Sequence, residues 1–229
     1  MNPAVPAASA RQRLLPFVLA VSFTSIVTGL FNLTEVLPTP VALLAGAGWG
    51  VGLGLLATWL RGKRVLGDWL EDGFVYLGTV GFAFAGCGGL MAILLLDGAL
   101  ESSSLTGETL EATFLPSIPY YIVVNSLLEI LIIPAVLFFA WRPGKRRILI
   151  GVAAAMYFLM RVWTYLAFVP ARMGWAEAEH STQALTAAER RQAASDLMLD
   201  DPRWMPILAM FALFLLAANL PARRRADTG

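Results

Sequence analysis

Two charged residues, Glu129 and Arg161, stand in apolar stretches of the sequence that are long enough to cross a lipid bilayer. A charge left alone at membrane depth costs from a few to roughly ten or more kcal/mol, so such residues pair and face the protein interior. Opposite charges on successive apolar stretches therefore predict a buried ion pair. An arginine can hold an anionic group, and a neighbouring carboxylate can exchange a proton when a ligand separates the pair.

Glu129 and Arg161 are predicted to lie at a similar depth in neighbouring helices. Glu129 is eleven residues from the beginning of the predicted span 118–141, and Arg161 is eight residues from the end of the predicted span 148–169. At about 1.5 Å of rise per residue, their depths differ by only about 4 to 5 Å. Polar residues one turn away on the same faces extend this site. The expected site residues are Asn125, Glu129, Tyr157, Arg161, Thr164 and Tyr165.

The amino-acid composition indicates that these helices lie in a lipid bilayer. Hydrophobic residues make up 58% of the chain and charged residues only 14%, whereas soluble domains carry about 25% charge. This excludes an ordinary soluble domain and predicts a polytopic membrane protein, since six segments approach the length of about 20 residues that a membrane helix needs. The predicted spans are 14–33, 41–60, 74–96, 118–141, 148–169 and 204–220.

Basic residues gather on one side of the predicted membrane. With six spans, the N-terminus, the turns at 61–64 and 142–147 and the C-terminus share a side and hold twelve of the seventeen Lys and Arg residues. The opposite side receives the acidic loop around residues 101–111. Cytoplasmic loops carry the basic excess, so both termini are predicted to be cytoplasmic, in the cell membrane. The arginine- and alanine-rich, lysine-poor usage favours a bacterial inner or plasma membrane.

The loop before the last predicted span contains the signature of a short helix outside the membrane. Thr186 and Glu189 have the spacing of a capping box, and good helix formers follow them. The expected fold is therefore an all-α integral membrane protein. It is a single domain over residues 1–229, a bundle of six transmembrane helices with one short extramembrane helix.

A polar stripe follows one face of the first predicted span. Thr24, Thr28, Asn32 and Glu35 recur at intervals of four, four and three residues. That spacing keeps them on one helix face from mid-membrane to the outer surface, where they could line a path open to the outside. Threonines in membrane helices also bond to their own backbone carbonyls, so the stripe has a purely structural alternative.

Glycines dominate the second predicted span and indicate close packing. Gly46, Gly50 and Gly54 have the small-xxx-small spacing that lets helix backbones approach, which predicts a helix–helix partner on this face. Neither a GxxxxGK[ST] loop nor a GxGxxG associated with a strand is present, and no nucleotide site is expected. The basic turns are interpreted as topology signals, so the expected partners are the lipid bilayer and a small apolar or anionic ligand, without nucleic acid.

No metal or cofactor is expected. His180 is the single histidine, so bis-histidine haem ligation within one chain is excluded. Glu177 and His180 share the i, i+3 spacing of metal ligands, but no third or fourth ligand is recognisable beside them. Cys87 is the single cysteine, which excludes an intramolecular disulfide and a CxxC motif.

The block MYFLMRVWTYLAFVPARM, residues 156–173, resembles a stretch of the anthrone-oxygenase-like family of small bacterial membrane proteins. It covers less than a tenth of the chain. The resemblance implies an oxygenase-like site around Arg161, Trp163 and Tyr165, and therefore an enzyme.

Three function classes are compatible with these patterns. The first is a protein that binds or transports a small molecule in its polar interior. The second is a membrane enzyme acting on an apolar substrate such as a quinone, polyketide or lipid, in which Arg161 holds an anionic group while Glu129 or a tyrosine moves protons. The third is an accessory subunit of a membrane complex, in which the Glu129–Arg161 pair only fixes the packing of the bundle.

Overall fold

The computed structural model of the chain describes residues 10–32, 37–141, 143–200 and 204–220. Within these ranges the chain is all-helical and forms no β-strand. Five helical stretches are long and apolar enough to cross a membrane, as a polytopic membrane protein requires. These stretches are Leu14–Phe31, Thr39–Gly62, Val65–Leu100, Gly107–Phe139 and Lys145–Ala176.

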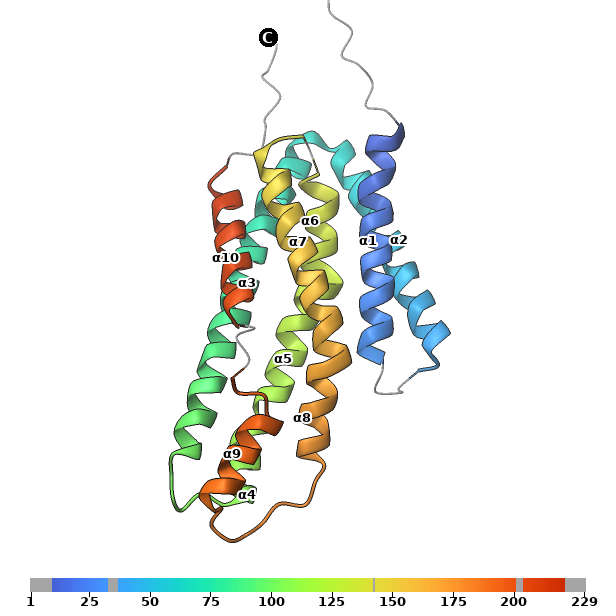
Figure 1. The fold of residues 1–229 in the computed structure, drawn as a ribbon. Helices are drawn as coiled ribbons and strands as arrows, with labels where there is room; N and C mark the ends of the chain where they lie inside the picture. Colours follow the sequence, from blue (N-terminus) through green and yellow to red (C-terminus); the bar gives the residue numbers. More distant parts are fainter. Residues whose placement is uncertain (1–9, 33–36, 142, 201–203, 221–229) are drawn as a thin grey trace, which may run out of the picture.

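The first three membrane-length helices are single, uninterrupted segments. Helix α1 is Ala10–Phe31, α2 is Thr39–Gly62 and α3 is Arg64–Leu100. With 37 residues, α3 is about 55 Å long and exceeds the roughly 30 Å of a bilayer core. It extends beyond the predicted span 74–96 at both ends because no proline interrupts residues 64–100, and it runs almost the full length of the molecule (Figure 1).

The two helices that carry the charged pair are each interrupted by a π-helical segment. The predicted span 118–141 is α5, η2 and α6, and the predicted span 148–169 lies within α7, η3 and α8. A proline follows shortly after each π segment, Pro134 in α6 and Pro170 in α8. The bounds are Ser117–Ser126 for α5, Leu127–Ile132 for η2, Ile133–Phe139 for α6, Lys145–Trp163 for α7, Thr164–Phe168 for η3 and Val169–Ala176 for α8.

A helical cap covers one end of the bundle. The helix predicted after Thr186 is present as α9, Ala187–Asp196, and its capping box is formed. A second short helix, α4, Gly107–Phe114, lies in the acidic loop, where no helix was predicted. Both pack at the end of the molecule where α3 and α8 finish (Figure 1). They bury a second hydrophobic cluster, here named the cap core, made of Leu96, Leu105, Leu110, Phe114, Ala193, Leu197 and Leu199.

The last apolar helix is shorter than predicted. Helix α10 is Trp204–Ala218, only 15 residues, whereas the predicted span was 204–220 and a membrane crossing takes about 20. The described ranges therefore contain five helices of spanning length and one shorter apolar helix. Helix α10 lies beside α3 and ends at the same end of the molecule as the beginning of α1 and the turn between α6 and α7 (Figure 1).

The capping box makes the stability of α9 dependent on pH. The Thr186 backbone N–H donates to Glu189 Oε2 at 2.7 Å, and this lowers the pKa of the Glu189 carboxyl from its ordinary value of 4.5. Because the folded pKa is the lower one, the cap stabilises α9 above the ordinary pKa and this contribution is lost as the pH falls through the folded pKa. We expect the protection of the α9 amides against hydrogen exchange, measured relative to the intrinsic exchange rate at each pH, to fall below pH 4.5. Glu189→Gln, which cannot ionise, should remove this dependence, and an unchanged pH profile in that variant would contradict it.

Candidate functional site

Glu129 is placed by the π segment η2 in the middle of the helix formed by α5, η2 and α6. A π turn inserts one extra residue and shifts the following side chains around the helix, and such segments occur frequently at functional sites. Pro134 begins the next α-helical turn without an N–H to donate. Glu129 is only 3% exposed, so its carboxylate faces the bundle interior.

Three side chains from one face of α7 and η3 converge on the Glu129 carboxylate. The Tyr157 hydroxyl donates to Oε1 at 3.2 Å and the Tyr165 hydroxyl donates to Oε2 at 2.9 Å. Arg161 pairs with Oε1 through its Nε. The three residues follow one another at intervals of four, so one helix face supplies the whole set of donors. The carboxylate is therefore paired and hydrogen-bonded, as burial requires.

The Arg161 guanidinium uses only part of its hydrogen-bonding capacity. It lies over the Tyr165 ring, with its central carbon 4.4 Å from the ring centroid, and its other polar neighbours are Glu129 and the Tyr165 oxygen. A guanidinium has five N–H donors. The Glu129 carboxylate and the Tyr165 oxygen use some of these donors, and the Nε makes its ion pair without a well-aligned hydrogen bond to a described residue. Arg161 is 6% exposed, so water reaches these donors poorly.

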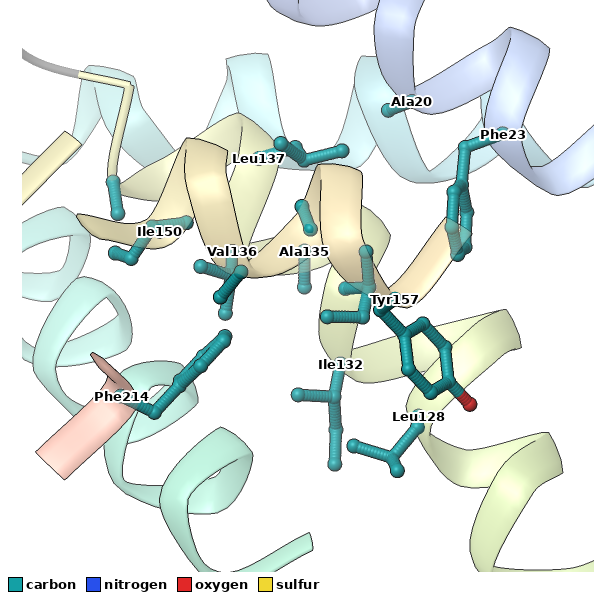
Figure 2. Close-up of a cluster of buried hydrophobic side chains, with 14 of the residues drawn as sticks. Ala20, Phe23, Leu128, Ile132, Ala135, Val136, Leu137, Ile150, Tyr157 and Phe214 are labelled. Carbon is teal, nitrogen blue, oxygen red and sulfur yellow. The ribbon is translucent and has the colours of Figure 1, made fainter. Parts of the chain in front are cut away.

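Aromatic rings enclose the cluster formed by Glu129, Arg161, Tyr157 and Tyr165, here named the acid–arginine cluster. Phe82 of α3 meets the Tyr157 ring edge-to-face at 5.3 Å. Figure 2 shows Tyr157 between Phe23 of α1 and Leu128 of η2, with its hydroxyl pointing away from the aliphatic side chains of α6. Two pockets of the described surface lie elsewhere, about 440 Å³ beside Lys63 and Trp69, and about 220 Å³ in the cap beside Trp175 and His180. Glu129, Arg161, Tyr157 and Tyr165 are each at most 6% exposed, so the acid–arginine cluster is closed in this structure.

Two of the six expected site residues stay outside the acid–arginine cluster. Thr164 is buried, but its hydroxyl donates to the Met160 carbonyl of its own helix at 2.8 Å. Asn125 is half-buried one turn before Glu129 and makes no hydrogen bond to another described residue. Their spacing along the helices predicts that Asn125 and Thr164 lie near Glu129 and Arg161. The π turn and hydrogen bonds to local backbone determine which side chains actually contact the Glu129 carboxylate.

The polar stripe of the first span packs against α2. Thr24 donates to its own backbone at Ala20, 3.0 Å away, and Thr28 lies against Gly46. Asn32 bonds in both directions with the backbone of Leu37 and closes the turn toward α2. Among the described residues these three pack against α2 or bond to local backbone, and the path-lining interpretation stays a prediction. Glu35, the fourth expected lining residue, lies outside the described residues.

The glycine stripe of α2 contacts α1 of the same chain. A Cβ at Gly50 would lie 2.9 Å from the Val21 Cα, and one at Gly46 would lie 2.7 Å from the Thr28 hydroxyl. At Gly54 the nearest rings are Phe17 of α1 and Phe138 of α6. The helix partner of Gly46, Gly50 and Gly54 in this structure is therefore α1, and the two helices form a closely packed pair, here named the α1–α2 hairpin.

Trp49 is a contact of the π segment that sequence patterns did not indicate. Its indole N–H donates to the Ile130 carbonyl at 2.7 Å. Pro134 lies four residues after Ile130 and has no N–H to offer that carbonyl, so Trp49 supplies a donor from another helix. The sequence does show that Pro134 leaves the Ile130 carbonyl without its usual helical donor. It does not show that Trp49 supplies a replacement, because that depends on how α2 packs against η2.

We expect Trp49→Phe to loosen the π segment beside Glu129. Leaving the Ile130 carbonyl without this donor should cost about 1 to 3 kcal/mol of unfolding free energy. Hydrogen exchange should accelerate at residues 127–139, measured by mass spectrometry on the purified protein. Trp59→Phe on the same helix is the control, because Trp59 contacts Lys63 at its ring face. Equal exchange in both variants would contradict a specific role for Trp49.

A second buried charge cluster, also not predicted, lies nearer the other end of α7. Arg146 is 6% exposed and pairs with Glu71 at 3.2 Å and with Asp72 at 2.6 Å. It ties the beginning of α7 to α3, far along the helix from Arg161. Sequence analysis assigned Arg146 to a basic turn, because a charge next to a loop carries no signal of burial.

Metal ligands are not assembled in the described residues, where no group of three or more His, Cys, Asp or Glu side chains could hold an ion. His180 stacks against Trp175 at 4.2 Å between ring centroids, in the cap. Comparison with protein-family models, curated proteins and solved structures finds no match to this chain. The resemblance of residues 156–173 stays an expectation, and the chemistry of the site rests on its geometry.

Proposed function

We propose that this chain is a six-span cell-membrane protein that binds a small anionic molecule in its interior and carries it across the bilayer. Arg161 is the anion contact, and Glu129 is the internal counter-charge that holds Arg161 between binding events. The observation that carries the proposal is the Arg161 guanidinium, which is only 6% exposed and whose Nε lies against the Glu129 carboxylate without a well-aligned hydrogen bond to any described residue. Carboxylate and phosphate groups match such a fork in geometry and charge.

The arrangement of the chain supports the proposed topology. The turns that join α2 to α3 and α6 to α7 lie at one end of the molecule, together with the beginning of α1 and the end of α10 (Figure 1). These turns carry Arg61, Lys63, Lys145 and Arg147, while the opposite end carries the acidic cap. We infer that α10 completes the sixth span and that the basic end, with both termini, is cytoplasmic.

Arg161→Lys tests the proposal because lysine keeps the charge that Glu129 needs but replaces the fork by a single ammonium. Protein purified in mild detergent would be analysed by native mass spectrometry for a copurifying anion, then titrated with acetate, benzoate and inorganic phosphate. We expect affinity to fall about 10- to 100-fold, the value of one bidentate charge-assisted contact, with thermal stability near that of the wild type.

Arg191→Lys, on the exposed face of α9, is the matched control and should bind like the wild type. Uptake of the bound anion into proteoliposomes then distinguishes transport from binding alone. If Arg161→Lys binds every tested anion as the wild type does, the guanidinium fork is not the contact and the proposal fails.

A membrane enzyme acting on an apolar substrate is the second candidate. Two phenols donate to one carboxylate at 2.9 and 3.2 Å, distances suited to moving a proton through Glu129. Tyr165→Phe separates the two functions, since it should abolish turnover of a substrate but leave anion binding at Arg161 within about threefold. Conversion of the copurifying molecule by the wild type and not by this variant would favour the enzyme.

A further inference from the structure

We propose, on the basis of the function proposed above, that the anion bound at Arg161 is amphipathic and enters from the bilayer. It has an apolar body, as a long-chain carboxylate does. The entry lies between the α1–α2 hairpin and the helix formed by α7 and η3. Since the acid–arginine cluster is closed, any ligand must displace part of the wall, and the four sides of the cluster differ in how they are built.

Both ends of the bundle are filled with apolar side chains. Toward the basic end, every residue from Ile132 to Ala140 is buried, and Phe139 stacks on Phe74 at 5.6 Å. Toward the cap, the cap core lies in the way, and the Arg172 guanidinium sits over the Phe168 ring at 4.1 Å while its Nε bonds to the Leu197 carbonyl. An aqueous route along the bundle axis would have to break one of these cores.

The side formed by α3 and α10 is filled by side chains that pack directly on the glycines of α3. A Cβ on Gly81 would lie 2.8 Å from a Leu128 side-chain carbon, and Gly78 is covered by the Phe214 ring. Phe82 bridges Phe214 at 5.0 Å and Tyr157 at 5.3 Å between ring centroids. Opening here would separate helices that glycines hold together.

The side formed by α1 is held by aromatic ring contacts and not by side-chain hydrogen bonds between the described residues of α1 and those of α7 or η3. Phe23 lies 6.5 Å from Tyr157 and 6.0 Å from Phe158, and Phe31 lies 6.2 Å from Tyr165. In the described ranges, the side-chain hydrogen bonds of α1 stay within the α1–α2 hairpin. Thr24 bonds to its own helix, Ser25 bonds to the Leu43 carbonyl of α2, and Asn32 closes the turn.

Two side chains of α2 tie the hairpin to the rest of the bundle. Trp49 donates to the Ile130 carbonyl at 2.7 Å and Arg61 donates to the Phe138 carbonyl at 3.0 Å. Both bonds lie along the α2 edge, and Phe17 of α1 meets Phe138 of α6 edge-to-face at 5.9 Å near the basic end.

The part of α1 that carries Phe23 and Phe31 can therefore swing away about these contacts, while the glycine contacts keep the hairpin intact. The gap that this movement opens between α1 and the helix formed by α7 and η3 is lined by phenylalanines, which can contact a hydrocarbon chain. The gap ends at the Arg161 guanidinium, which can bind the carboxylate.

A photoreactive long-chain carboxylate carrying a diazirine tests the ligand class and the route together. Labelling of protein in nanodiscs, mapped by peptide mass spectrometry, should fall on residues 23–31 of α1 and 158–165 of α7 and η3. We expect Arg161→Gln to reduce this labelling at least tenfold, and Arg191→Gln to leave it unchanged. Labelling confined to the lipid-facing residues of α3 would overturn the assigned route.

A closed form of the same protein provides the control for the route. This variant carries Phe23→Cys and Phe158→Cys in a Cys87→Ser background. Oxidation or a short bifunctional thiol reagent would link the two introduced thiols. We expect the joined form to lose the labelling of α7 and reduction to restore it, with inorganic phosphate and acetate as water-soluble comparison anions.

The outcomes separate this inference from the proposed function. Equal labelling in the joined and reduced forms overturns entry through this seam. Binding of phosphate or acetate but not of the long-chain carboxylate overturns the ligand class while the anion site stands. Failure of all three anions to bind the unmodified protein removes the proposed function itself.

Discussion

Glu129→Gln is expected to destabilise the protein by about 3 to 5 kcal/mol of unfolding free energy. The substitution preserves the size of the side chain but leaves the buried positive charge of Arg161 without its counter-charge, which is the costly half of breaking a buried ion pair. One of the two tyrosine hydroxyls, Tyr157 or Tyr165, can still donate to the amide oxygen and the other can accept from the amide NH2, so the loss reports the charge rather than a cavity. Unfolding by SDS titration, followed by tryptophan fluorescence, measures the difference.

The double variant Glu129→Gln, Arg161→Gln should recover most of the lost stability, because no net charge remains buried. Glu108→Gln in α4 is the control, since Glu108 is exposed. A Glu129→Gln variant as stable as the wild type would show that another group compensates Arg161. A double variant that is stable but loses anion binding would locate the role of the pair in the ligand rather than in folding.

Gly50→Leu is expected to cost about 1 to 3 kcal/mol of unfolding free energy and to open the α1–α2 hairpin. A Cβ at this position would lie 2.9 Å from the Val21 Cα, so the clash falls on a backbone atom that cannot rotate away. Separation of α1 from α2 would move Phe23 off Tyr157, and access to the acid–arginine cluster should increase. Tryptophan fluorescence and hydrogen exchange at residues 14–31 measure the two effects.

Gly52→Leu is a closely matched control on the same helix. Nothing lies within 4 Å of a Cβ at Gly52, so the leucine would face outward and stability should change by less than about 0.5 kcal/mol. If both variants are destabilised equally, the effect belongs to glycine in the helix and not to the α1 contact.

The pairing of residues along α7 follows directly from helix geometry. Tyr157, Arg161 and Tyr165 are four residues apart, so any helix places them on one face, and a buried charge on that face needs an opposite charge near it. The four members of the acid–arginine cluster were therefore accessible from spacing. Spacing could not show that Thr164 stays outside the cluster. Its hydroxyl donates to the Met160 carbonyl instead, and that bond depends on local backbone geometry.

The limits of sequence patterns are clearest where two distant segments meet. The polar stripe of the first span repeats every three to four residues, as expected for a face that lines a path. A helix face that packs against glycines repeats in the same way, so the spacing does not distinguish the two. Trp49 and Ile130 are 81 residues apart, and no local pattern joins an indole to one particular carbonyl. The π segments η2 and η3 likewise follow from packing as well as from the prolines beside them.

Local sequence patterns were enough to predict the all-helical class and the apolar character of its long helices, because composition and period depend on residues close together in the chain. They also predicted the capping box of α9, whose two members are three residues apart. Three features became visible only in the folded chain: the α1–α2 hairpin covers the acid–arginine cluster, Arg146 is buried against α3, and the cap has its own core. These features depend on which helix faces come together, and that choice is made by the packing of the whole chain.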